Sequence, residues 1–122
     1  MRLIFLIATG LVVLIALQHT MFLVLQMFLW EHDVGRGVFG TTPEIAKLSA
    51  TLAKQQGLYN GFLAAGLLWG LFAKKSDFVV FFLLCVIAAG VFGALTASPR
   101  IFVVQALPAI VALGAWRVSR AK

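Results

Sequence analysis

The side chains best suited to chemistry in this apolar chain form one polar cluster, Gln55, Gln56, Tyr59 and Asn60. The last three have the spacing i, i+3 and i+4, so in a helix their amide and phenol groups would lie on one face. These groups can exchange hydrogen bonds with a ligand or with another helix, and a phenol can also transfer a proton. Because an unpartnered polar group in hydrocarbon is costly, we expect this face to point into protein or water.

Two further polar positions precede this cluster, and one follows it. His19 and Gln26 are seven residues apart and would share one face of an earlier helix. His19 either forms a hydrogen bond with a neighbouring helix or takes part in ligand binding or proton transfer. We expect His19 or Gln26 to close a polar pocket lined by the first cluster. Gln105, near the end of the chain, is expected to hydrogen-bond across a helix bundle.

Metal binding and catalysis have little support in the sequence. Glu31, His32 and Asp33 are ligand types, but three adjacent residues cannot easily face one ion. We interpret this glycine-rich segment as a solvated loop and predict no metal site. Cys85 lies in an apolar run and fits neither a disulfide framework nor a metal spacing. No catalytic motif is present, so the sequence leaves open whether the protein is an enzyme.

Four long stretches without a charged residue must position these side chains. Of the 122 residues, 62% are hydrophobic, and the mean hydropathy is +1.05, above that of a soluble domain. Each stretch approaches or exceeds the roughly 20 residues that span a bilayer, although the last is short. The sequence therefore predicts an all-α protein, a transmembrane four-helix bundle in a single domain over residues 1–122. Its helices are expected at about 3–30, 43–73, 78–97 and 100–118.

The basic residues lie at the ends of these helices. The net charge of +6 is therefore explained by membrane topology and lipid head groups, without nucleic acid as a partner. If both termini lie on one side, that side holds six basic residues and the other side four. The six are Arg2, Lys74, Lys75, Arg117, Arg120 and Lys122; the four are Arg36, Lys47, Lys54 and Arg100. This bias predicts a multi-pass protein of the inner cell membrane with cytoplasmic termini.

Small residues at four-residue spacing predict close helix packing. Gly57, Gly61 and Ala65 form one such face, and Ala89 and Gly93 belong to another. Because two faces exceed what one antiparallel hairpin needs, we expect a homo-oligomer.

Two local signals bear on the helix geometry. Thr41, with Glu44 three residues later and Pro43 between them, predicts a capping box at the start of the second helix. Pro108 should kink the last helix.

Six motifs carry a resemblance that covers nearly the whole chain. They are Gln26–Trp30, Val38–Gly40, Pro43–Glu44, Gln56–Leu67, Gly90–Thr96 and Gln105–Ala109. Through them the chain resembles the family of small four-helix membrane proteins catalogued as domain of unknown function thirteen-oh-four. That family brings no established activity.

A more distant likeness concerns the order of the elements. In this order the chain is similar to the membrane-associated eicosanoid and glutathione metabolism family. The shared features are a long first helix, a loop ending in Phe39-x-x-x-Pro43-Glu44, a polar start to the second membrane helix and a proline in the last helix. This resemblance implies a homotrimer that binds glutathione between subunits, although that family's arginine- and carboxylate-rich signature is missing. It places Lys54, Gln55, Gln56, Tyr59 and Asn60 in the corresponding region. The binding of glutathione is expected on the basis of fold analogy alone.

Three classes of function fit these observations. The first is a membrane protein whose polar site binds a small amphiphile or a thiol cofactor. The second is a structural or lipid-interacting protein whose polar residues satisfy one another. The third is a small transporter, which would need a continuous polar path through an oligomer. We rank the ligand-binding site first.

Overall fold

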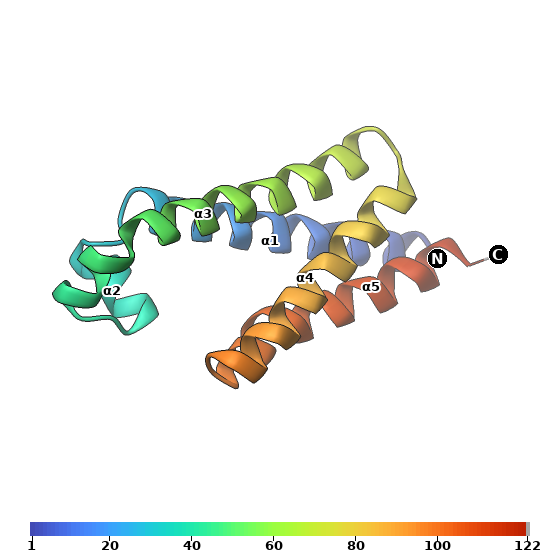
Figure 1. Ribbon diagram of the computed structural model, residues 1–122. Coiled ribbons are helices and arrows are strands. Elements are labelled where there is room, and N and C mark those ends of the chain that lie inside the picture. Colours follow the sequence, from blue (N-terminus) through green and yellow to red (C-terminus); the bar gives the residue numbers. More distant parts are fainter. Residues whose placement is uncertain (122) are drawn as a thin grey trace. The chain divides into compact units, whose positions relative to one another are not determined.

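The computed structural model describes residues 1–121, and all of its regular structure is helical (Figure 1). The described part of the chain contains α1 (Arg2–Met27), α2 (Asp33–Phe39), α3 (Pro43–Phe72), α4 (Ser76–Thr96), a π-helical segment η1 (Phe102–Ala106) and α5 (Leu107–Arg120). The predicted all-α class is therefore confirmed. The long helices lie close to the predicted ranges, and α2 is an additional helix.

Within residues 1–121, three helices are long and apolar enough to cross a membrane: Arg2–Met27, Ser76–Thr96 and the continuous stretch Phe102–Arg120. The fourth long helix, α3, has 30 residues and would extend about 45 Å at the usual rise per residue. It is not apolar enough to be counted with them, because the polar segment Gln55–Asn60 lies in the part of α3 that has no charged residue. A bundle of four membrane-spanning helices therefore stays a prediction.

The chain forms two compact units, and α1 and α3 each contribute to both. The central unit is Leu17–Ala64, and the terminal unit combines Met1–Ala16 with the chain from Ala65 onward.

In the central unit, the predicted loop after Trp30 is wrong in part, because Asp33–Phe39 forms α2. The Arg36 guanidinium bonds to the Asp33 carboxylate one turn earlier, and the same side chain donates to the Glu31 carbonyl oxygen at 2.6 Å. Gly40 then ends the helix with φ +67°, a left-handed conformation that glycine adopts without strain. The chain turns there and enters α3.

The helix α3 begins at Pro43 as predicted, but its capping residue differs from the prediction by one position. The Thr42 hydroxyl, and not that of Thr41, accepts a hydrogen bond from the Ile45 backbone N–H at 3.2 Å. Pro43 occupies the first helical position, where the missing N–H costs nothing. With the cap at Thr42, Glu44 is at the second helical position and cannot complete the predicted capping box.

Glycines let α1 and α3 approach closely within the central unit. A Cβ at position 57 would lie 2.6 Å from Met27 Cγ, and one at position 61 would lie 2.6 Å from Leu23 Cδ1. The Gly57–Gly61 face, which we expected to serve self-association, is therefore occupied by α1 of the same chain. Self-association itself stays a prediction.

In the terminal unit, α4 runs beside η1 and α5 (Figure 1). A Cβ at Gly90 would lie 2.7 Å from the Ala106 backbone nitrogen, so this glycine is needed for the close approach of η1. Several valines and alanines of α4, η1 and α5 are fully buried: Val79, Val86, Ala106, Ala109 and Ala112. Small residues on both sides allow van der Waals packing between the backbones, which is the main attraction available between helices in lipid.

Pro108 acts on the turn that precedes it. The Leu107 backbone N–H donates to the carbonyl oxygen of Phe102, five residues earlier, so the helix widens to a π-helical turn over Phe102–Ala106. Proline has no N–H to donate and crowds the preceding turn, which favours such a widened segment. We expected a kink at Pro108; the structure shows a π-helical turn directly before it, and the kink itself stays a prediction.

Candidate functional site

The centre of the polar cluster in the central unit is a hydrogen bond between α1 and α3. The Asn60 side-chain amide donates to Gln26 Oε1 at 2.7 Å, and both groups are partly buried. Gly57, one turn before Asn60, brings the two helices near enough for these short side chains to meet. The sequence predicts that His19 or Gln26 faces this polar cluster, and the structure pairs Gln26 with Asn60.

His19 lies deeper along α1 and is fully buried. Its ring meets the edge of Phe22 at 5.3 Å between centroids, with the ring planes at 73°. Phe22 lies 6.5 Å from Phe39 at the end of α2, and Phe39 lies 5.1 Å from Trp30. A continuous aromatic row therefore connects the histidine to the residues that follow α1, and such ring pairs stabilise beyond the area they bury.

Trp30 also anchors the start of α3. Its indole N–H donates to Ser49 Oγ at 3.1 Å, and the Ser49 hydroxyl donates to the Ile45 carbonyl oxygen at 2.7 Å. An indole that packs on one face and hydrogen-bonds at its edge suits the boundary between lipid and water. This contact fixes one wall of a small cavity.

The cavity has a volume of about 240 Å³ and combines apolar with charged side chains. Its apolar lining is Met27, Phe28, Trp30 and Ala50, and its polar lining is Glu31, His32 and Lys54. Within residues 1–121, neither Lys54 nor Glu31 takes part in an ion pair. The cavity therefore presents one ammonium, one carboxylate and one imidazole beside an aromatic wall.

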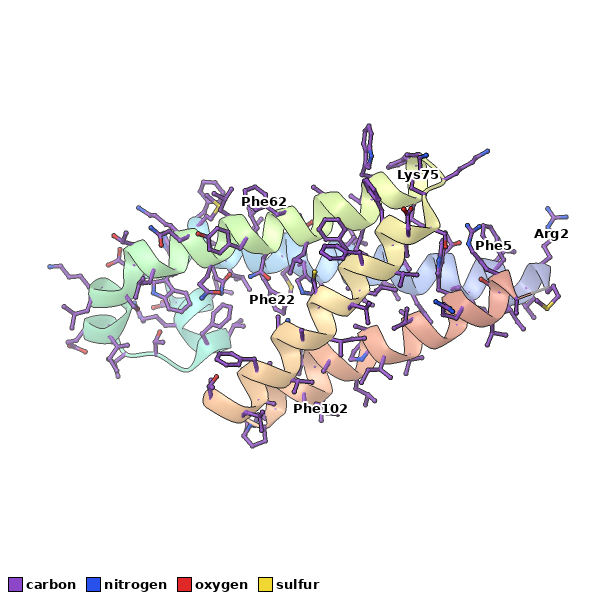
Figure 2. All side chains as sticks on the ribbon, turned by 45° about the vertical axis from the view of Figure 1, so that its right-hand side comes forward. Arg2, Phe5, Phe22, Phe62, Lys75 and Phe102 are labelled. Carbon is purple, nitrogen blue, oxygen red and sulfur yellow. The ribbon has the colours of Figure 1, made fainter. Side chains whose placement is uncertain are left out.

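The remaining predicted residues of α3 lie away from this cavity. Gln55, Gln56 and Tyr59 are exposed, and Tyr59 keeps 57% of its surface accessible. The Tyr59 ring lies 6.1 Å from that of Phe62, which points outward from α3 in Figure 2. Helical spacing groups these residues with Asn60, but only Asn60 is turned far enough to reach α1.

Gln105 belongs to the terminal unit, where it lies on η1. Its side-chain nitrogen is 3.5 Å from the Val86 carbonyl oxygen on α4, the outer limit of a hydrogen bond. This contact agrees with the expected role of Gln105 in linking helices.

Sequence reasoning missed His32, Met27 and Phe28 as lining residues because it assigned the segment after Trp30 to a solvated loop. Two signals could have revealed α2: the opposite charges of Asp33 and Arg36 at i, i+3, and Gly40 directly after an apolar residue. Within residues 1–121, no three histidine, cysteine or acidic side chains are grouped to hold a metal ion.

Comparison with known proteins identifies the family. A curated protein of Lactococcus lactis subsp. lactis (strain IL1403), described as "Uncharacterized protein YpaA", is 31% identical over 104 residues, covering 82% of this chain and 87% of that protein. No solved structure matches the chain. The family model described as "Protein of unknown function (DUF1304)" matches residues 13–116, which include the Gln26–Asn60 pair and the cavity. The chain therefore belongs to this family, as its motifs indicated.

Proposed function

We propose that this protein is a multi-pass membrane protein that binds one end of a small amphiphile in the cavity beside Trp30. The observation that carries the proposal is the combination of Lys54 with an aromatic and aliphatic wall in one cavity of the central unit. An ammonium without a carboxylate partner attracts an anion, while the apolar wall takes the adjoining hydrocarbon.

The size and charge of the cavity narrow the ligand class. Small-molecule pockets usually measure about 300–1,000 Å³. At about 240 Å³, this cavity holds a head group and a few adjoining carbons, and the remainder of the chain would lie in lipid. Glu31 contributes a negative charge to the same lining, which disfavours a dianion. A long-chain monocarboxylate therefore fits best.

The proposed setting is the inner membrane, with four spans and both termini cytoplasmic. In that arrangement the end of α1 at Met27 faces outward, so the cavity opens at the outer head-group region. A trimer would cover the exposed polar run of Gln55, Gln56 and Tyr59 on α3. Glutathione is the competing ligand offered by fold analogy, and its two carboxylates suit this lining less well.

Fluorescence quenching tests the proposal. A brominated long-chain fatty acid bound in the cavity should quench Trp30, so replacing Trp30 with Phe should remove the saturable part of the quenching. Lys54→Gln should weaken binding about twofold to fivefold, the effect of about 0.4–1 kcal/mol for an exposed charge pair. Lys47→Gln is the matched control, because Lys47 is an exposed lysine of α3 outside the cavity lining.

Two results would contradict the proposal: equal affinity in the Lys54 and Lys47 variants, or saturable quenching that is undiminished when Trp30 is replaced. Added glutathione should not compete with the fatty acid. If glutathione displaces the fatty acid, glutathione is the better candidate for the ligand.

A structural role is the second candidate, and the hydrogen bond between Gln26 and Asn60 favours it. Two polar groups that satisfy one another need no ligand. If the protein retains no amphiphile after purification in mild detergent and binds none on titration, this role replaces the first.

A further inference from the structure

The terminal unit contains a second cavity, built around the junction of α4 with the end of α5. Trp116 of α5 is only 2% exposed, and its indole N–H donates to Ser76 Oγ at the first residue of α4, at 2.9 Å. This bond joins residues 40 positions apart. It fixes the indole at the level where α4 begins and α5 ends.

Arg120 stacks on this fixed indole. Its guanidinium carbon lies 4.5 Å from the centroid of Trp116 and 5.7 Å from that of Phe5, and the two rings are 6.2 Å apart. Figure 2 shows Phe5 beside the end of α5. The guanidinium lies beside both rings, and this contact restricts its rotation while its N–H groups remain available in the plane. Arg120 is therefore partly oriented before an anion binds.

The cavity beside these groups has a volume of about 610 Å³ and two chemically distinct sides. Arg117, Arg120 and Asp77 lie on the polar side, and Val80, Phe81 and Leu84 of α4 form the apolar side. The apolar residues recur at i, i+1 and i+4, so they follow α4 away from its polar start. The cavity thus passes from charge to hydrocarbon along the axis of a helix that is apolar enough to cross a membrane.

The charges in the cavity sum to one net positive charge, from two arginines and one aspartate. Asp77, in the first turn of α4, accepts the backbone N–H of Phe78 on its Oδ1 at 3.1 Å. In the chain up to residue 121, neither Arg117 nor Arg120 forms an ion pair with it. Both guanidinium groups are therefore available to an external anion.

We propose that this cavity binds an anionic phospholipid, with its phosphate between Arg117 and Arg120 and one acyl chain along Val80, Phe81 and Leu84. Planar guanidinium groups bind phosphate oxygens in a bidentate manner, and basic pockets between membrane helices suit anionic head groups. The position at the ends of two candidate spans places the arginines at head-group depth. A free phosphate would use only the polar half of the cavity, so the apolar half identifies the ligand as a lipid.

Native mass spectrometry of the full chain in mild detergent tests this site, with phosphatidylglycerol and phosphatidylcholine added at equal concentration. We expect preferential retention of phosphatidylglycerol. The variant with both Arg117→Gln and Arg120→Gln should lose it about 25-fold, because each basic residue near an anionic surface contributes about fivefold, or 1 kcal/mol. Millimolar inorganic phosphate should not displace the lipid.

The matched control replaces Lys74 and Lys75 with Gln. It removes two charges from the α3–α4 turn, where Figure 2 places Lys75, but neither lysine lines the cavity. Retention should then fall less than about twofold, since the lost charges lie outside the site. An equal loss in the control and arginine variants would show general charge attraction and refute the site.

Two gentler variants keep the test decisive if the double arginine variant fails to fold. Asp77→Asn should raise phosphatidylglycerol retention, because it removes the repelling charge from the lining and leaves a side chain of the same size. Arg120→Lys should lower it, because an ammonium lacks the planar stack. Unchanged retention in both variants, or equal retention of the two lipids by the wild type, would overturn the proposal, as would displacement of the lipid by phosphate.

Discussion

Replacing Asn60 with Leu should destabilise the protein, and replacing Gln26 as well should restore much of the loss. In the single variant, Gln26 Oε1 keeps its partly buried position but loses the amide that lies 2.7 Å away. An unsatisfied buried polar group costs about 1–3 kcal/mol, whereas removing both partners is nearly neutral. Hydrogen bonds between membrane helices average about 0.6 kcal/mol and reach about 1.7. Since the pair is only partly buried, we expect a single-variant loss of about 1–1.5 kcal/mol.

The assay is a double-variant cycle with Gln26→Met and Asn60→Leu, which keep the side-chain volumes similar. The free energy of unfolding is measured by titration with a denaturing detergent, followed by far-UV circular dichroism. A coupling energy of about 0.6–1.7 kcal/mol should appear between the two positions. Gln56→Leu is the control, because Gln56 is exposed on the same helix and should show no coupling to Gln26. Additive losses at positions 26 and 60, or equal coupling in the control, would refute the reasoning.

Three further predictions follow from individual contacts. Gly35→Ala should destabilise the fold by about 1–3 kcal/mol, because the new Cβ would meet the carbonyl group of Leu29. Gly37→Ala, where the new Cβ would meet open space, should instead stabilise α2 by about 0.4–1 kcal/mol. Unfolding in detergent compares the two variants, and equal effects would contradict the contact at Gly35. Ser76→Ala should cost about 1–3 kcal/mol by leaving a buried indole N–H without its acceptor, and Ser76→Thr should retain stability; losses of the same size in both variants would count against it. With the native cysteine replaced by serine, single cysteines at Gly37 and Ala121 should react with an impermeant maleimide from opposite membrane faces; labelling from one face rejects the topology.

The long helices could be predicted because each depends on one strong signal, an apolar run bounded by charges. The sequence also predicts that His19 or Gln26 faces the polar cluster of α3, because α1 runs toward Trp30 and α3 returns from the same end. These conclusions need only the length of a helix and its direction. The sequence does not predict which two side chains meet, and the bond between Gln26 and Asn60 is a finding of the structure.

The cavity beside Trp30 could not be predicted, because it depends on how a short segment folds. Asp33–Phe39 contains two glycines, which favour a loop, yet the Arg36–Asp33 ion pair and the left-handed Gly40 make it a helix. Helical spacing likewise grouped Tyr59 with Asn60, but a difference of one residue rotates a side chain by about 100° and leaves Tyr59 exposed.

The π-helical turn at Phe102–Ala106 amounts to one extra residue within an otherwise regular helix. Deleting one residue there, Val103 for example, would let the segment close into an α-helix and would turn everything after it by about 100° about the helix axis. Trp116 would then point away from Ser76, and Arg120 away from Phe5. The number of residues in the turn before Pro108 thus sets the angular position of residues more than two turns later. An insertion or deletion in this turn would rotate the side chains at the far end of α5 about the helix axis.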